Sequence, residues 1–216
     1  MTSETFLFQL QSELYGFYND RLRWVIIFIE SRYGKFPVPI LNEIRAVQDH
    51  IARCYDNNMA NDEQYIDEQM RAAKGHFMRC LLDGYKYIWY HYTPEVRQKY
   101  FWAKLLGDLQ SIDNGDFVKQ ISKLRVDAKA MNFKAREMES KDKDVSLDLY
   151  EQSIGKLIQL DELYESHISE IAWSVRKGLT MKVLAGLGWL IALGFAIHRN
   201  WGSILSLLGY LNLTII

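Results

Sequence analysis

Residues 183–197 read VLAGLGWLIALGFAI, fifteen consecutive residues without a charge. A basic pair interrupts this run, and residues 200–216 then give seventeen more positions without a charged side chain. A helix that spans a bilayer needs about 20 apolar residues, with roughly 17 as the lower limit. Counting back through Lys182, whose ammonium can reach the interface, to Gly178 extends the first run to twenty residues. The sequence therefore predicts two transmembrane helices within 178–216.

Basic residues around the two apolar runs predict their orientation. Arg176, Lys177 and Lys182 precede the first run or open it, whereas Arg199 is the only fixed positive charge between the runs. Because positively charged flanks stay in the cytoplasm, we expect the large N-terminal part and the C-terminus there. The start of the chain has no basic segment followed by an apolar run, so no secretory signal is expected. A buried helical hairpin in a soluble domain is the alternative for the apolar runs.

Composition disfavours several classes of protein. Lys and Arg total 26 against 27 Asp and Glu, and this balance argues against a dedicated nucleic-acid binder. Three Pro, thirteen Gly and 13% aromatic residues argue against a β-sandwich, a collagen-like chain or a disordered chain. Two cysteines are too few for a disulfide scaffold or a zinc site, and no phosphate-loop or hydrolase motif occurs. We therefore expect no metal and no cofactor.

Helical periodicity covers almost all of the remaining chain and predicts an all-α fold. Apolar positions and breaks predict helices over residues 4–32, 40–55, 62–91 and from 93 onward. Gly34 is expected to end the first of them, and Thr93 with Pro94 is a favourable N-cap and first-turn pair for the last. The aromatic-rich run 85–92 is expected to pack in the core.

Longer and more highly charged helical patterns begin at Phe117. A break at 141–144 separates two apolar stripes and so predicts a helical hairpin or stalk, in which Asp161 interrupts the heptad register. The second stripe leads straight into the first apolar run, which predicts one continuous helix from about 145 to 197. The predicted domains are a cytosolic helical bundle over 1–112, a hairpin or stalk over 113–177, and a two-span hairpin over 178–216.

A repeated motif, R-A-x3-H-x2-R-C, is the most specific feature and occupies residues 45–54 and 71–80. Offsets of three and four residues share one face of a helix, so each His lies on the same face as the second Arg of its copy. An antiparallel pairing of the two helices would bring these faces together. The candidate residues for binding a partner or a signal are His50, Arg53, His76 and Arg79.

Three interpretations of this motif remain open. The first is a polar seam between helices, in which His and Arg bind Asp56, Asp83, Glu43 or the backbone. The second is a recognition pocket for a phosphate or an acidic partner. The third is ribonuclease chemistry, with His as general acid or base and Arg stabilising the charge of the transition state. The catalytic residues would then be Arg45, His50, Arg71 and His76.

Small residues form a stripe on the first predicted span. Gly188, Ala192 and Ala196 recur every four residues, a spacing that lets membrane helices approach closely. We therefore expect the lipid bilayer and further copies of this chain as partners. Acidic residues are absent from both runs, which disfavours a transporter.

Two families resemble this chain. Arg45-x4-His50 and Arg71-x4-His76 are similar to the Arg-x4-6-His motif of HEPN domains, helical bundles of many prokaryotic toxins and defence nucleases. That family often has a polar residue directly after the Arg, where this chain has an alanine in both copies. The layout of a helical domain followed by two C-terminal spans resembles the two-transmembrane effectors of bacterial anti-phage systems, found in some retrons and CRISPR loci.

The second resemblance implies an effector of the bacterial inner membrane. A reverse transcriptase–nucleic acid complex or a CRISPR effector would be the partner that restrains or triggers it. We therefore expect a non-enzymatic protein that oligomerises and permeabilises the membrane when triggered. A membrane-anchored HEPN-type ribonuclease and a non-enzymatic membrane scaffold are the alternatives.

Overall fold

The computed structural model describes residues 3–56, 58–59, 61–202 and 206, and every regular element among them is a helix. The elements are α1 (Ser3–Phe17), the π-helical turn η1 (Tyr18–Leu22), α2 (Arg23–Tyr33), α3 (Val38–Arg53), α4 (Glu63–Leu106), the 3-10 segment η2 (Leu109–Gly115), α5 (Asp116–Met138), α6 (Lys143–Ser166) and α7 (Ile168–Arg199). The predicted all-α class is therefore confirmed for these residues. Most of the second predicted span lies outside the described residues.

Packing divides the chain into two compact units. The first comprises Met1–Gln98 with Ile121–Leu163, and the second comprises Lys99–Gln120 with Tyr164–Ile216. Each unit therefore joins segments that are distant in sequence. The boundaries predicted near 112 and 177 follow the order of the chain and stay a prediction.

The first predicted helix forms as three consecutive helical elements, α1, η1 and α2. Apolar side chains at Leu14, Leu22, Val25 and Ile29 are buried along it, as three- and four-residue spacing requires. The helix ends at Gly34, which adopts φ 58° and donates its N–H to the carbonyl oxygen of Glu30 at 3.0 Å. A left-handed residue at this position favours glycine, so the predicted stop is confirmed.

Helix α4 passes through Pro94, and the helix start predicted there is wrong. Ile88, Tyr92 and Val96 are buried on both sides of the proline and continue one packed face through it. Proline removes one backbone hydrogen bond from a helix, and burial of this face offsets that loss. The Thr93 hydroxyl is buried without a hydrogen-bond partner among the described residues, so it does not cap a helix.

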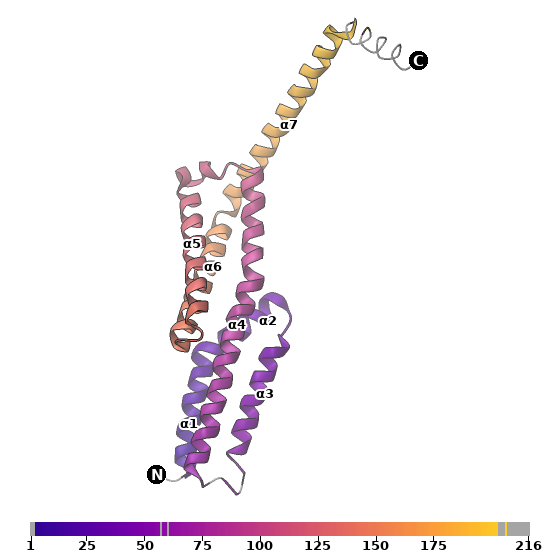
Figure 1. Ribbon diagram of the computed structural model, residues 1–216. Coiled ribbons are helices and arrows are strands. Elements are labelled where there is room, and N and C mark those ends of the chain that lie inside the picture. The colour runs from indigo at the N-terminus through magenta and orange to yellow at the C-terminus, as the bar shows by residue number, and fades with distance from the viewer. Residues whose placement is uncertain (1–2, 57, 60, 203–205, 207–216) are drawn as a thin grey trace, which may run out of the picture. The chain divides into compact units, whose positions relative to one another are not determined.

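Helices α5 and α6 form the predicted hairpin (Figure 1). Within the first unit, the Ser146 hydroxyl donates to the carbonyl oxygen of Ala135 at 2.9 Å, and the Ser153 hydroxyl donates to that of Ala128 at 2.8 Å. The Asp142 carboxylate accepts the backbone N–H of Val145 at 3.1 Å and so caps α6. These small hydroxyl residues satisfy their polar groups while the two helices pack closely.

The continuous helix predicted from 145 to 197 is wrong, because His167 separates α6 from α7 with φ −109° and ψ 20°. Its Nε2 lies 2.9 Å from Oδ2 of Asp113, and its ring packs on Phe117 with centroids 4.9 Å apart. These contacts hold the His167 side chain against the segment that precedes α5. The apolar helix α7 therefore has its own N-terminus.

Candidate functional site

Helices α3 and α4 run antiparallel, the arrangement in which the two faces of the repeated motif meet, and lie side by side in Figure 1. Their contacts step in opposite directions along the two helices. Cys80 contacts the carbonyl oxygen of Ile40, His76 contacts Glu43, and Gln69 contacts His50. The two copies of the motif therefore face each other within the first unit.

The histidines of the two copies meet at this interface. The ring centroids of His50 and His76 lie 5.1 Å apart with 34° between the ring planes. Nδ1 of His50 lies 2.8 Å from Oε1 of Gln69, and Nδ1 of His76 lies 2.7 Å from Oε2 of Glu43. Nη2 of Arg79 also lies 2.7 Å from Nδ1 of His76, so this ring nitrogen faces both the Glu43 carboxylate and the Arg79 guanidinium. Neither Nε2 has a hydrogen-bond partner among the described residues.

Glu43 links His76 to Arg79. The Arg79 Nε donates to Oε2 of Glu43 at 3.0 Å. Burial by itself raises the pKa of Glu43, but hydrogen bonds from His76 and Arg79 and their charge outweigh it and hold that pKa below its ordinary value. The carboxylate thus compensates the cation beside the paired histidines. This arrangement favours the interpretation of the motif as a polar seam.

The other arginines of the motif lie exposed. Arg71 is 69% exposed and pairs with Asp67, four residues earlier on the same helix, at 2.6 Å. Arg45 and Arg53 are exposed on α3. Among the described residues, the contacts thus gather His50, His76 and Arg79 into one cluster and leave the other predicted arginines outside it.

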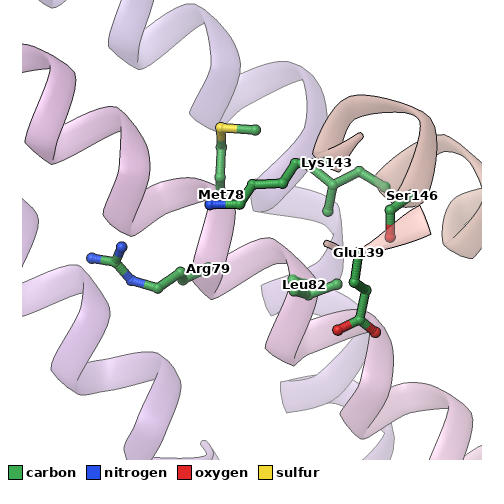
Figure 2. A pocket seen from close by; sticks show the side chains of 7 residues that line it. Met78, Arg79, Leu82, Glu139, Lys143 and Ser146 are labelled. Atoms are coloured by element: carbon green, nitrogen blue, oxygen red, sulfur yellow. The ribbon is translucent and has the colours of Figure 1, made fainter. Parts of the chain in front are cut away.

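A small hollow lies next to Arg79, between α4 and the α5–α6 connection (Figure 2). Its volume is about 30 Å³, and it is lined by Met78, Arg79, Leu82, Glu139, Lys143, Ser146 and Leu147. Figure 2 shows Lys143 reaching toward Met78, while the guanidinium of Arg79 points away from Glu139. A hollow of this size does not hold a nucleotide, because ligand clefts measure roughly 300–1,000 Å³.

Residues from outside the motif contribute to this region and were missed from the sequence. Gln69 lies two positions before the second copy, Glu139 directly follows α5, and Lys143 is the first residue of α6. Gln69 lies seven residues, two helical turns, before His76, and this offset on the same face was the signal that could have found it. For the pair from the hairpin, the sequence carries no such signal, since packing between distant segments brings them to Arg79.

The two cysteines of the motif are buried free thiols. Burial raises the pKa of Cys80 to about 12 and also raises the pKa of Cys54. Thiols with raised pKa values are poor nucleophiles. Within the described part of the chain, no cluster of three or more His, Cys, Asp or Glu side chains could hold a metal ion.

Helix α7 is long and apolar enough to cross a membrane. Every described residue from 179 to 202 is exposed, including Trp189 at 76% and Phe195 at 71%. Gly188, Ala192 and Ala196 follow one another along one exposed face. An exposed apolar surface of this size is typical of a helix that contacts a membrane or a protein partner.

Within the described residues, the chain is all-α and has a polar seam between paired helices and one helix of membrane-spanning length. Comparisons with protein-family models, with curated proteins and with solved structures find no match to the chain. Its function is therefore inferred from its own residues.

Proposed function

We propose that the chain is an effector of the bacterial inner membrane that self-associates through α7 and permeabilises the bilayer when triggered. The observation that carries this proposal is the uncovered apolar surface of α7, where all described residues from 179 onward are exposed. Lipid removes that surface from water and so stabilises the chain. The second predicted span, 200–216, completes a two-span hairpin in this proposal.

Charge supports a cytoplasmic location for the folded helices. Arg176, Lys177 and Lys182 flank or open the apolar part of α7 on the side of those helices. Basic residues near the ends of a span are retained on the cytoplasmic side. The chain would then return to the cytoplasm after its second span.

Self-association would use the small residues of α7. At Gly188, an added Cβ meets no atom within 4 Å, so that position is open to another helix. In lipid, helices associate by close packing rather than by the hydrophobic effect, and small residues permit that packing. Gly188, Ala192 and Ala196 would form the contact between copies.

Control would reside in the cluster of His50, His76 and Arg79. Its guanidinium, and the imidazole Nε2 atoms that lack a partner among the described residues, suit an acidic protein segment or a phosphate. A defence-system partner bound there would restrain or trigger the membrane helices. This assignment to anti-phage defence comes from the resemblance in layout and is part of the proposal.

Membrane potential in cells tests the proposal. Cells expressing the full chain are compared with cells expressing a chain that ends at Lys177, using a potential-sensitive dye. We expect the full chain alone to depolarise the membrane, and depolarisation should survive His50→Ala and His76→Ala. Depolarisation by the shortened chain, or its loss only in the histidine variants, would contradict an effect that resides in the spans.

A membrane-anchored ribonuclease is the second candidate, and the pairing of the two imidazoles favours it. Two histidines with centroids 5.1 Å apart can serve as base and acid across one phosphodiester. Purified full chain in detergent should then cleave RNA, and His50→Ala should abolish cleavage. Cleavage that persists in His50→Ala would show that the paired histidines are not its catalytic site.

A further inference from the structure

The end of α4 lies against α7 within the second unit, with backbone close to backbone. A Cβ added at Gly178 would overlap the carbonyl oxygen of Leu106, and one added at Gly107 would lie 3.0 Å from the Ser174 hydroxyl. Gly178 therefore requires glycine for this close approach, and Gly107 leaves little room for a side chain. That buried hydroxyl accepts the backbone N–H of Asp108 at 2.7 Å, which ties the chain leaving α4 to α7.

The contact of Lys182 shows which part of α7 lies beside the end of α4. Its Nζ donates to the carbonyl oxygen of Leu105 at 2.6 Å. That carbonyl belongs to the last turn of α4, where the helix itself supplies no N–H partner. The uncharged run 183–197 begins at the next residue. The last turn of α4 therefore lies where α7 becomes apolar.

Large apolar side chains are exposed on the last two turns of α4. Phe101 is 56% exposed, Trp102 is 52% exposed, and their rings pack edge to face with centroids 5.5 Å apart. Leu105 is 50% exposed, and Trp173 on α7 is 60% exposed. Tryptophan and other aromatic residues are enriched where a membrane meets water. We term the exposed α4 surface formed by Phe101, Trp102 and Leu105 the aromatic collar.

Basic side chains accompany the aromatic collar. Lys177 and Lys182 line a hollow of about 540 Å³ at the junction, with Gly178 and Met181 on its α7 side. Asp108 contributes one carboxylate to the same hollow, against two ammonium groups. Lys182 spends one of its three donors on Leu105 and keeps two for another acceptor. Lys104, exposed on the same turn of α4, adds to the positive charge.

We infer that the last two turns of α4 form a second membrane-contact element, in which the aromatic collar lies in the headgroup layer and the lysines beside it, Lys177 and Lys182 of α7, bind anionic phospholipid. The inference rests on the proposed membrane role of α7 and adds a surface beyond the span. Two observations select lipid as the occupant. Leu105 of the collar accepts Lys182 one residue before the uncharged run of α7 begins, and cations line the hollow beside this contact, as anionic headgroups require.

Spin labels on the full chain in bilayer discs test this inference. Single cysteines are introduced by Trp102→Cys in the collar, by Leu190→Cys in α7 and by Tyr90→Cys, an exposed aromatic position earlier on α4. The native thiols are buried, and the unsubstituted chain measures their background labelling. Collisions with oxygen, which prefers lipid, are compared with collisions with a water-soluble nickel complex.

We expect the label at 190 to be in lipid, the label at 90 in water, and the label at 102 several-fold less accessible to nickel than that at 90. If the label at 190 is in lipid but the label at 102 is as accessible to nickel as that at 90, the collar does not contact the membrane, although α7 does. A label at 190 in water would remove the membrane role itself, and the collar with it.

Lipid composition tests the lysines separately. The label at 102 should be several-fold less accessible to the nickel complex in phosphatidylglycerol discs than in phosphatidylcholine discs. Lys177→Gln should reduce that difference, whereas Lys129→Gln, an exposed lysine on α5, should not. Equal protection in both lipids would refute binding of anionic headgroups.

Discussion

Asp161 is a carboxylate buried in the first unit, and its partners come from two other helices. The Tyr92 hydroxyl donates to Oδ2 of Asp161 at 2.8 Å, and Nη2 of Arg32 lies 3.3 Å from the same oxygen. The Arg32 guanidinium also lies over the Tyr92 ring, 4.2 Å from its centroid. A buried charge of this kind fixes how the helices pair, because the carboxylate finds these partners in one register. The first unit thus pairs its helices through buried or half-buried polar groups at Asp161 as well as at Glu43.

Glu43 should make the stability of the chain depend on pH. Its pKa lies below the ordinary value of 4.5, so its contribution is complete above that pH and is lost as the pH falls through the folded-state pKa. Glu43→Gln should lower the free energy of unfolding by about 1 kcal/mol at pH 7, and the difference should vanish below that pKa. Thermal unfolding of the full chain in detergent, followed by circular dichroism, measures it.

Asp49→Asn is the matched control for this experiment, since Asp49 is exposed on the same helix. The control should track the unsubstituted chain across the same pH range. A gap between Glu43→Gln and the unsubstituted chain that persists into acid would mean that the carboxylate is not the stabilising charge.

Part of the candidate site could be predicted from single residues. Helical spacing put each His on one face of its helix with the second Arg of its copy, and the antiparallel pairing that the structure shows brings His50 and His76 together. Glu43 was among the partners expected for a polar seam. The place of Lys143 beside Arg79 could not be predicted, because it depends on where the α5–α6 connection packs.

Two glycines in helices test the packing of elements. At Gly84 of α4, an added Cβ would lie 2.5 Å from Cγ1 of the buried Val25, whereas at Gly155 of α6 nothing lies within 4 Å. Gly84→Ala should therefore destabilise the chain by about 1–3 kcal/mol through overpacking. Gly155→Ala should stabilise it by up to about 1 kcal/mol through helix propensity. Thermal unfolding of both variants checks the pair, and an equal gain in both would show that α4 and α2 do not pack closely at Gly84.

Helix α7 offers a matched pair for self-association. Gly188 lies on the stripe with Ala192 and Ala196, whereas Gly186 lies roughly 160° around the helix. An added Cβ meets nothing within 4 Å at either glycine, so neither substitution disturbs the chain itself. Gly188→Leu should abolish crosslinked oligomers and depolarisation, while Gly186→Leu should preserve both. If both variants lost oligomers and depolarisation equally, the cause would be the larger side chain anywhere on α7, and the small-residue stripe would not be the contact.

The ends of helices could be predicted where a local signal determines them. They could not be predicted where packing with distant residues determines them. Gly34 ended its helix as expected, because a left-handed residue there needs no partner from elsewhere. Pro94 did not start a helix, since a buried face continues through it. The break at His167 depends on Asp113, which is 54 residues away along the chain and so leaves no local pattern.

At the scale of the molecule, the helical units and the apolar helix present different surfaces. The polar seam satisfies its own charges, so it can be formed before any partner binds. Helix α7 cannot cover its apolar side chains from within the described chain, and it depends on what surrounds it. In the proposed function, this division corresponds to activity in α7 and control in the seam.

Replacing residues 178–216 by an unrelated two-span anchor separates the three functions considered for this chain. A permeabilising effector uses the residues of its spans, so the exchanged chain should no longer depolarise cells. A ribonuclease or a scaffold needs only attachment, and its function should survive the exchange. Recovery of the exchanged chain in the membrane fraction, with its helical content intact by circular dichroism, is the control. Depolarisation by the exchanged chain would place the activity outside α7 and direct attention to His50 and His76.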